Sequence, residues 1–539
     1  MERTALGTSG GPTDAWWRSG VVYQIYPWSF QDSDGDGVGD LPGILRRLDH
    51  LNDGTERSLG IDAIWLSPFY RSPMVDFGYD VEDHRAVDPR FGTLEDFDAL
   101  LEGCHARGLR VLIDFVPNHT SNRHPWFLES RRDRRSAKRD WYVWADPAPD
   151  GGPPNNWSSE FPLGDAPTPA WTFDRATGQY FLHSFLPQQP DLNWLNPEVR
   201  EAMEDVLRFW LDRGVDGFRL DAVHRIGHDP ELRDNVEGEP RRDQDLELTH
   251  EVLRGFRRVL DAHGAIAVGE VYLLDPERMI RYYGDGGDEL HLAFNFWFLR
   301  ERWSARAFAD AARRFESLLP PGAWPDYTLS NHDHPRAITR YDERGLGPAR
   351  ARVAAMMLLT LRGTPFLYYG EEIGMPDVPI PRERWRDPVG RDPCRTPMRW
   401  EPGPRGGFTT GEPWLPVGDA AGVDVRSQDG DPRSMLSLYR RLLWYRRGSS
   451  ALRLGDVAFL DTGEDVFAFE RRARDARLLV ALNFSERAAE VSLDGAPAAG
   501  ALEISTDPGR APSSVGLRPL ELGPLEGVIV RIQGVEDGR

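Results

Sequence analysis

Carboxylate side chains recur where short apolar segments of the chain end. Asp114 lies in VLIDF, Asp221 follows GFRL, Glu270 follows AVG and Asp333 lies in LSNHD. Each residue alone has a structural explanation as a cap or an ion pair. In a barrel of alternating strands and helices, however, residues at the carboxyl ends of strands project toward one mouth, where catalytic groups gather. The pattern therefore predicts a carboxylate cluster that performs acid–base chemistry.

Two carboxylates across a scissile bond, with a third nearby, are the arrangement used for glycoside hydrolysis. If the two stand about 5–5.5 Å apart, the reaction proceeds by double displacement through a covalent glycosyl-enzyme. Arg219 lies two residues before Asp221 on an extended segment, so it shares a face with that carboxylate and can keep it ionised. Glu270 follows an apolar run and has no adjacent arginine, which suits a protonated acid.

The elements that must position these residues alternate in type from Gly20 to about Gly370. Helix-patterned segments, such as Leu94–Cys104 with its apolar residues at helical spacing, separate short apolar or β-branched ones. This alternation predicts an α/β fold, a (β/α)8 TIM barrel. The eight predicted strands are Val21–Trp28, Ile61–Pro68, Arg110–Pro117, Gly217–Ala222, Ala265–Val271, His291–Phe296, Tyr327–Ser330 and Pro365–Tyr369.

Two regions depart from this alternation. Residues 120–194 are rich in Trp, Pro, Gly and Asn without a sustained period, which predicts a small inserted domain after the third strand. Residues 451–539 contain short alternating segments between turns, which predicts a C-terminal antiparallel β-sandwich domain. The barrel is then assigned to 15–119 and 195–450, and residues 1–14 to a flexible N-terminal arm.

The composition excludes several classes of function. The formal net charge of −21 repels nucleic-acid phosphates and anionic lipid heads, so we expect a small neutral substrate and no nucleic-acid or membrane partner. Cys104 and Cys394 are too few for a disulfide framework or a cysteine-rich zinc site. The first 14 residues lack the apolar core of a signal peptide, so we expect a cytoplasmic protein.

The quoted segments resemble the signature regions of glycoside hydrolase family 13, the α-amylase family, in order and spacing along nearly the whole chain. QPDLNW (Gln189–Trp194), GYDVEDH (Gly78–His84) and RTPMRW (Arg395–Trp400) are typical of its α-glucosidase and oligo-1,6-glucosidase subgroup. Arg399 departs from the glutamine more usual in RTPMQW, and Asn52–Ser58 resembles an insertion.

The resemblance implies roles for individual residues. Asp221 would be the nucleophile, Glu270 the acid/base and Asp333 the transition-state stabiliser. Asp80 and Arg395 would clamp the non-reducing-end hydroxyls and close the pocket, and His119 and His332 would donate to hydroxyls near the reaction centre. The full implied substrate-binding set is Tyr79, Asp80, His119, Gln189, Arg219, His332 and Arg395. Aromatic residues that could stack on sugar faces, or simply pack in the core, are Tyr79, Phe115, Trp157, Phe181 and Phe185.

An acidic loop, DSDGDGVGD (Asp32–Asp40), places carboxylates at alternate positions with glycines that permit a tight wrap. It lacks the glutamate of an EF-hand, and a metal-free acidic turn is the alternative. It resembles the single-cation loop of the family's oligoglucosidases. That resemblance implies one structural Ca²⁺ or Mg²⁺ with the ligands Asp32, Asp34, Asp36, Asp40 and the Val38 carbonyl, and no organic cofactor.

The implied activity is that of a retaining, exo-acting α-glucosidase that releases glucose from short α-glucosides. The small side chain of Ala222, directly after the nucleophile, favours α-1,4 over α-1,6 links. One alternative is a transglucosylase or a trehalose-synthase-like isomerase, which would share the same three carboxylates. A remote alternative is an inactive binding or scaffold subunit. Either a monomer or a homodimer fits the sequence.

Overall fold

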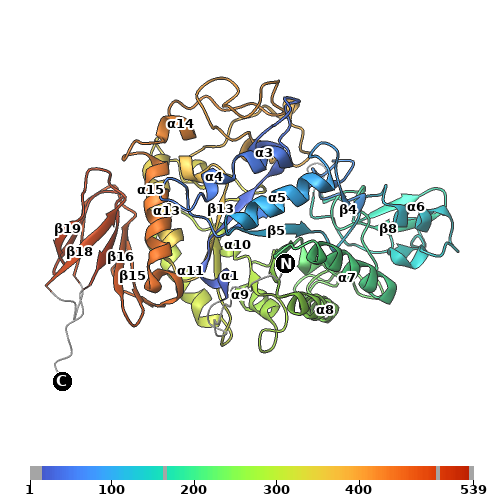
Figure 1. The fold of residues 1–539 in the computed structure, drawn as a ribbon. Coiled ribbons are helices and arrows are strands. Elements are labelled where there is room, and N and C mark those ends of the chain that lie inside the picture. The colour runs from blue at the N-terminus through green and yellow to red at the C-terminus, as the bar shows by residue number, and fades with distance from the viewer. Residues whose placement is uncertain (1–14, 162–166, 493–497, 533–539) are drawn as a thin grey trace, which may run out of the picture.

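The barrel forms the centre of the molecule in the computed structural model, which describes residues 15–161, 167–492 and 498–532 (Figure 1). The N-terminal arm assigned to residues 1–14 lies outside the described residues. Eight parallel strands form one sheet in the order β11-β10-β9-β5-β2-β1-β13-β12. The predicted (β/α)8 barrel is thereby confirmed. Its strands are β1 (Val22–Ile25), β2 (Ala63–Leu66), β5 (Arg110–Phe115), β9 (Gly217–Leu220), β10 (Ile266–Gly269), β11 (Leu292–Ala293), β12 (Asp326–Thr328) and β13 (Thr364–Tyr368).

Burial on both faces explains why these strands read as continuous apolar runs. Every residue of β1, β2, β9 and β10 is buried, as expected for parallel strands with helices outside and packed side chains inside. The covering helices have apolar inner faces. In α5 (Leu94–Ala106), Thr93 and Asp96 form a capping box, while Phe97, Leu100 and Cys104 are buried. The other long helices of the barrel are α7 (Pro197–Asp212), α8 (Glu247–His263), α11 (Ala305–Leu318) and α13 (Gly347–Thr360).

The chain between β5 and α7 forms a small sheet beside the barrel mouth. The antiparallel strands β6 (Trp144–Ala145), β7 (Trp171–Asp174) and β8 (Gln179–Leu182) pair in the order β6-β8-β7, and helix α6 (Pro125–Arg132) precedes them. An isolated bridge between His119 and Asp191 joins the start and the end of this excursion. It therefore leaves and rejoins the barrel at one point, and α6 and β8 lie to one side of the barrel (Figure 1).

A second, shorter hairpin shapes the loop after β2. Strands β3 (Tyr70–Arg71) and β4 (Asp83–Val87) pair antiparallel, and the residues between them turn back toward the barrel. Met74 and Phe77 have φ of 63° and 50° in this turn, a left-handed conformation that non-glycine residues seldom adopt. The sequence pattern did not predict this hairpin.

The C-terminal region packs against α11 and α13, on the side of the barrel away from β6–β8 (Figure 1). Its larger sheet has the order β14-β15-β16-β21-β18-β19, and β17 (Ala489–Val491) pairs with β20 (Leu520–Leu522). The antiparallel sheet predicted for this region is confirmed. The larger sheet contains β14 (Asp456–Phe459), β15 (Val466–Arg472), β16 (Arg477–Asn483), β18 (Ala499–Ser505), β19 (Ser513–Gly516) and β21 (Gly527–Arg531).

The described residues contain no helix with the length and apolar character needed to span a bilayer.

Candidate active site

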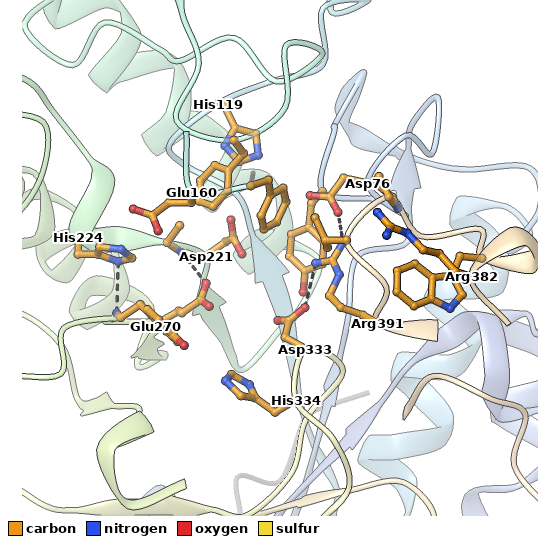
Figure 2. A pocket seen from close by; sticks show the side chains of 18 residues that line it. Asp76, His119, Glu160, Asp221, His224, Glu270, Asp333, His334, Arg382 and Arg391 are labelled. Carbon is orange, nitrogen blue, oxygen red and sulfur yellow. Dashed lines mark hydrogen bonds and ion pairs between the residues drawn. The ribbon is translucent and has the colours of Figure 1, made fainter. Parts of the chain in front are cut away.

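A cavity of about 810 Å³ opens at the carboxyl ends of the barrel strands (Figure 2). Its walls come from the segments after β2, β5, β9, β10, β12 and β13. The lining residues are Asp76, Tyr79, His119, Glu160, Phe161, Phe185, Asp221, Ala222, His224, Glu270, Tyr272, Asp333, His334, Arg382, Trp385, Pro388, Val389 and Arg391. The structure therefore brings Asp221, Glu270 and Asp333 into one cavity, where the sequence predicted a carboxylate cluster.

One buried guanidinium connects three carboxylates at the base of this cavity. Arg219 Nη1 lies 2.6 Å from both Asp114 Oδ1 and Asp221 Oδ1, and Arg219 Nη2 lies 2.8 Å from Glu270 Oε2. The sequence argument held that Glu270 has no arginine beside it. The structure shows otherwise, because Arg219 on β9 is the register partner of Val268 on β10, two residues before Glu270. Burial raises the pKa of Asp221, an effect that Arg219 opposes and that Glu270 and Asp114 reinforce.

The backbone next to Asp221 fixes Glu270. Ala222 has φ 44° and ψ 40°, in the left-handed region, and its N–H donates to Glu270 Oε2 at 2.9 Å. The N–H of Val223 donates to the Glu270 carbonyl at 3.2 Å. The chain after β9 is thus tied to the end of β10, which brings Asp221 and Glu270 to adjacent nitrogens of Arg219.

Asp333 lies in a cationic environment. Its Oδ1 is 3.0 Å from Arg391 Nη1 and 3.0 Å from Arg395 Nη2, and its Oδ2 is 3.3 Å from His332 Nε2. Burial raises the pKa of this carboxyl, but His332, Arg391 and Arg395 outweigh burial and hold it well below the ordinary value. Asp333 is therefore ionised, and the Arg219 contact favours the ionised form of Asp221 against the effect of burial on its pKa.

The sequence prediction named Asp80 and Arg395 as the sugar clamp. In the structure the residues four positions earlier, Asp76 and Arg391, lie at the cavity instead. Asp76 and Arg391 line the cavity and form an ion pair. Asp80 does not reach the cavity: it is fully buried and accepts hydrogen bonds from Ser72 Oγ and the N–H groups of Val75 and Asp76. Arg395 is likewise fully buried behind Asp333.

Of the other predicted substrate residues, some line the cavity and the others lie behind the lining residues. Tyr79 and His119 line the cavity. Gln189, Arg219 and His332 are buried behind the wall, so their side chains act through neighbours. Gln189 Nε2 donates to Asp76 Oδ2 at 2.9 Å and lies 3.1 Å from His119 Nε2.

His332 is held between Gln24 and Tyr79. Its Nδ1 lies 2.8 Å from Gln24 Nε2 and its Nε2 lies 2.6 Å from the Tyr79 hydroxyl. Its ring stacks on Tyr79 with an interplanar angle of 8°. The ring is fully buried and does not line the cavity. The structure places His332 against Tyr79 and Asp333, and its donation to a sugar hydroxyl stays a prediction.

Among the aromatic candidates only Tyr79 and Phe185 line the cavity. Phe115 packs on Phe218 and Phe256, Trp157 on Trp171, and Phe181 on Phe127, all as core contacts. Core packing was the alternative explanation for these aromatic residues, and it holds for Phe115, Trp157 and Phe181.

Arg399, which replaces the usual glutamine in RTPMRW, is buried and does not line the cavity.

The cavity has a closed end and an open end. The closed end contains the buried side chains of Asp76, Tyr79 and His119 and the half-buried side chain of Arg391. The open end contains Glu160, Tyr272, His334, Arg382 and Trp385, of which Trp385 is 38% exposed. Sequence reasoning missed all of the open-end residues, as well as Asp76, Arg391 and His224. Only His224 and His334 carried a signal, since His224 lies three residues after Asp221 and His334 directly follows Asp333.

The acidic loop after β1 gathers three of its four aspartates. Oxygen atoms of Asp32, Asp34 and Asp40 lie within 4.8 Å of one another. Asp36 is not part of this group, and its Oδ1 instead accepts the Val38 N–H at 2.8 Å. Three converging carboxylates repel one another, and hard oxygen ligands of this kind suit Ca²⁺ or Mg²⁺. The donor set therefore fits a divalent cation.

Comparison with known families agrees with this fold. Residues 24–455 match the family described as "Alpha amylase, catalytic domain". The chain belongs to the α-amylase family, glycoside hydrolase family 13, and is an enzyme of that family.

Individual relatives cover almost the whole chain. A probable alpha-glucosidase of Rhizobium meliloti (strain 1021) is 45% identical over 517 residues, which are 89% of this chain and 92% of the relative. The oligo-1,6-glucosidase of Parageobacillus thermoglucosidasius is 37% identical over 525 residues, 88% of this chain and 91% of the relative. A crystal structure of the alpha-glucosyl transfer enzyme XgtA has a TM-score of 0.88 at 42% identity, with 96% of this chain and 100% of that chain covered.

Proposed function

We propose that this protein is a retaining, exo-acting α-glucosidase that releases glucose from the non-reducing ends of short α-glucosides. The observation that carries the proposal is the Arg219 guanidinium, whose two terminal nitrogens contact Asp221 and Glu270 at the base of a cavity with one closed end. Two carboxylates held this close suit direct attack by one of them rather than by an intervening water.

The contacts assign individual atoms to the two steps. Asp221 Oδ1 is engaged by Arg219, so Oδ2 is the atom that attacks the anomeric carbon and forms the glucosyl ester. Glu270 Oε2 accepts from Ala222 N–H and contacts Arg219, so the acidic proton resides on Oε1 and passes to the departing glycosidic oxygen. In the second step Glu270 takes a proton from water, and the hydroxide oxygen displaces Asp221 to release α-glucose.

The closed end supports the release of single glucose units. Asp76, held by Arg391 and Gln189, presents a charged wall that a terminal glucose can meet with its hydroxyls but that a longer chain cannot pass. Asp333, kept ionised by its cationic neighbours, stabilises positive charge that develops on the sugar ring in the transition state. The alanine methyl at position 222 leaves space for an α-1,4-linked leaving sugar.

The second candidate function is glucosyl transfer or isomerisation through the same glucosyl ester. It is favoured by similar structures, namely the alpha-glucosyl transfer enzyme and the trehalulose synthase MutB from Pseudomonas mesoacidophila MX-45, which has a TM-score of 0.87 at 34% identity over 97% of this chain and 100% of that chain. The two functions differ in whether water or a sugar hydroxyl intercepts the intermediate.

We also propose that the loop Asp32–Asp40 holds one structural divalent cation. Asp32, Asp34 and Asp40 are its side-chain ligands, and the Val38 carbonyl remains a predicted one. Such an ion would neutralise three carboxylates and stabilise the connection between β1 and helix α3 (Leu41–Arg46), which Asp40 caps by accepting the Gly43 N–H. That the protein is a monomer or a homodimer, and that it lies in the cytoplasm, stay predictions.

The experiment is product analysis with maltose, isomaltose, sucrose and trehalose, followed by proton NMR during the first minutes. We expect glucose from maltose, with α-glucose appearing before mutarotation. Initial β-glucose would overturn the retaining mechanism. Conversion of sucrose mainly into isomeric disaccharides, with little free glucose, would favour the second candidate function.

A further inference from the structure

Two histidines, His224 and His334, line the cavity near Glu270 and Asp333 and have no part in the steps above. In Figure 2 the ring of His224 lies beside Glu270, and the ring of His334 faces the space below Glu270 and Asp333. The Nδ1 atom of each ring lies within hydrogen-bond distance of a neighbouring residue. The identity of that partner fixes which nitrogen carries the proton.

For His334 the partner is the side chain of Asn331. The N–H groups of Asp333 and His334 both lie 2.9 Å from one Asn331 side-chain atom. Because a backbone N–H can only donate, that atom is the oxygen of the amide and not its nitrogen. His334 Nδ1 lies 3.1 Å from the same oxygen and must therefore carry a proton. In a neutral ring Nε2 is then a bare acceptor.

For His224 the partner is the backbone of Tyr272. The Tyr272 N–H lies 3.3 Å from His224 Nδ1 and can only donate, so Nδ1 is the bare nitrogen. In a neutral ring Nε2 then carries the proton and is a donor. The two histidines thus have opposite polarity.

Both rings are neutral near pH 7. Burial lowers the pKa of His224, and the Glu270 carboxylate offsets this only in part. Burial also lowers the pKa of His334 against the opposing effect of Asp333. A charged ring at either position would donate from both nitrogens and remove the difference between them.

Tyr272 holds the two rings in place together. Its backbone fixes His224, and its ring stacks near His334 with centroids 6.2 Å apart and an interplanar angle of 28°. Phe296 stacks near His334 as well, at 5.7 Å and 21°. Arg300 Nη1 donates to the Tyr272 hydroxyl at 3.2 Å. The rings are therefore positioned before any ligand arrives, which lowers the entropic cost of binding.

We propose that His224 Nε2–H and His334 Nε2 form a donor–acceptor pair of fixed polarity that recognises a sugar as the leaving group or acceptor. The donor meets a hydroxyl or ring oxygen of that sugar, and the acceptor receives one of its hydroxyl protons. A leaving group without hydroxyls has no proton to offer the acceptor nitrogen of His334. This inference rests on the proposed function, since it assigns the leaving-group side from the roles of Asp221 and Glu270.

The activity test compares the kcat/KM for maltose with that for 4-nitrophenyl α-glucoside. Asparagine places its terminal atoms near the position of Nδ1, and glutamine places them near Nε2. His224→Asn and His334→Asn should each lower the maltose/aryl ratio about tenfold, the value of one neutral hydrogen bond. His224→Gln and His334→Gln should lower it by less than about threefold. His263→Asn, at the exposed end of α8, is the matched control and should leave the ratio unchanged.

Equal losses on both substrates in the asparagine variants would overturn the inference, because they indicate a structural or catalytic role. A wild-type enzyme that cleaves neither substrate contradicts the proposed function instead. The tautomers can be checked without turnover by NMR of protein labelled with ¹⁵N-histidine, the two signals being assigned from their loss in the asparagine variants. We expect a proton on Nδ1 of His334 and on Nε2 of His224. The opposite pattern at either ring would overturn the donor–acceptor pair.

Discussion

The N–H of Ala222 donates a hydrogen bond to Oε2 of Glu270 at 2.9 Å, so the residue after the proposed nucleophile orients the proposed acid. An oxygen that accepts this bond cannot be replaced by an amide nitrogen without loss. In Glu270→Gln the amide oxygen will therefore occupy the Oε2 position, and the NH₂ group will occupy the position of the acidic proton. The side chain keeps its place but cannot protonate a leaving group.

We accordingly expect Glu270→Gln to lower kcat for maltose by about 10²–10⁴-fold, the usual contribution of general acid catalysis. The loss should be much smaller for α-glucosyl fluoride, whose leaving group needs no proton. Asp221→Asn should abolish turnover of both substrates, because an amide cannot form the glucosyl ester. Steady-state kinetics on the two substrates will distinguish the roles, and an equal loss in Glu270→Gln would refute the acid assignment.

A second prediction separates Asp76 from Asp80. Asp76→Asn should reduce kcat/KM on the order of 100-fold for maltose and for the aryl glucoside alike, since it weakens charged hydrogen bonds worth about 1.5–3 kcal/mol to the terminal glucose. Asp80→Asn should mainly destabilise the fold by about 1–3 kcal/mol, because an amide cannot accept from all three donors that surround Asp80. Kinetics and thermal melting on both variants give the comparison. A larger catalytic loss in Asp80→Asn would restore the sequence assignment.

A third prediction concerns the cation loop. Adding Ca²⁺ or Mg²⁺ to chelator-treated protein should raise the melting temperature, because an ion bound only to the folded state stabilises it by mass action. Asp34→Asn should weaken this response at least about tenfold in apparent affinity. Asp36→Asn, whose carboxylate lies outside the group, should change it much less. If neither chelator nor added ions changes the melting temperature, the loop does not hold a structural cation.

The sequence predicted the barrel because its strands are buried on both faces and so appear as uninterrupted apolar runs. It overestimated the sixth strand, expected at His291–Phe296 but observed only at Leu292–Ala293. The reason is local: the Asn295 side chain accepts the Phe298 N–H and starts helix α10 (Phe296–Leu299).

The site was predictable at the strand ends and not in the loops. Asp76 and Asp80, like Arg391 and Arg395, are residues of one type four positions apart, and the resemblance assigned the clamp to the member of each pair that does not line the cavity. For Asp76 and Asp80 the choice depends on the left-handed turn at Met74 and Phe77, which no residue type in the segment signals. The contact of Arg219 with Glu270 depends on the register of two strands separated by about 50 residues.

A fourth prediction follows from Asp326, at the start of β12. It is fully buried, and neither carboxylate oxygen has a hydrogen-bond partner among the described residues. Burial raises the pKa of this group from 3.8 to about 8. Between about pH 4 and 8 the folded state keeps the Asp326 proton, whereas the unfolded state releases it. The free energy of unfolding that this protonation contributes is therefore lost as the pH rises from about 4 to 8.

Asp326→Asn removes this titration. The variant should be more stable than the wild type by about 2–4 kcal/mol at pH 8, and the difference should shrink toward pH 5. Melting temperatures of both proteins across this range provide the measurement. A constant difference between the two curves would show that Asp326 does not titrate in this window.

The last prediction concerns linkage and rests on the conformation of Ala222. Its methyl group leaves room beside Asp221 for the leaving sugar of an α-1,4 link, so maltose should be cleaved with a higher kcat/KM than isomaltose. Ala222→Val should shift the ratio toward isomaltose by an amount on the order of 1–3 kcal/mol, as expected for steric discrimination by one or two methyl groups.

The left-handed φ of 44° at Ala222 adds a second effect, because a β-branched residue is strained there and should lower stability by about 1–3 kcal/mol. Ala222→Ser is the matched control, since it enlarges the side chain without branching and should leave both the ratio and the melting temperature nearly unchanged. The valine variant therefore needs kinetics on the two disaccharides together with a melting curve. If the wild type prefers isomaltose, or if valine lowers both activities equally, the crowding argument fails and the linkage preference must arise from the open end of the cavity.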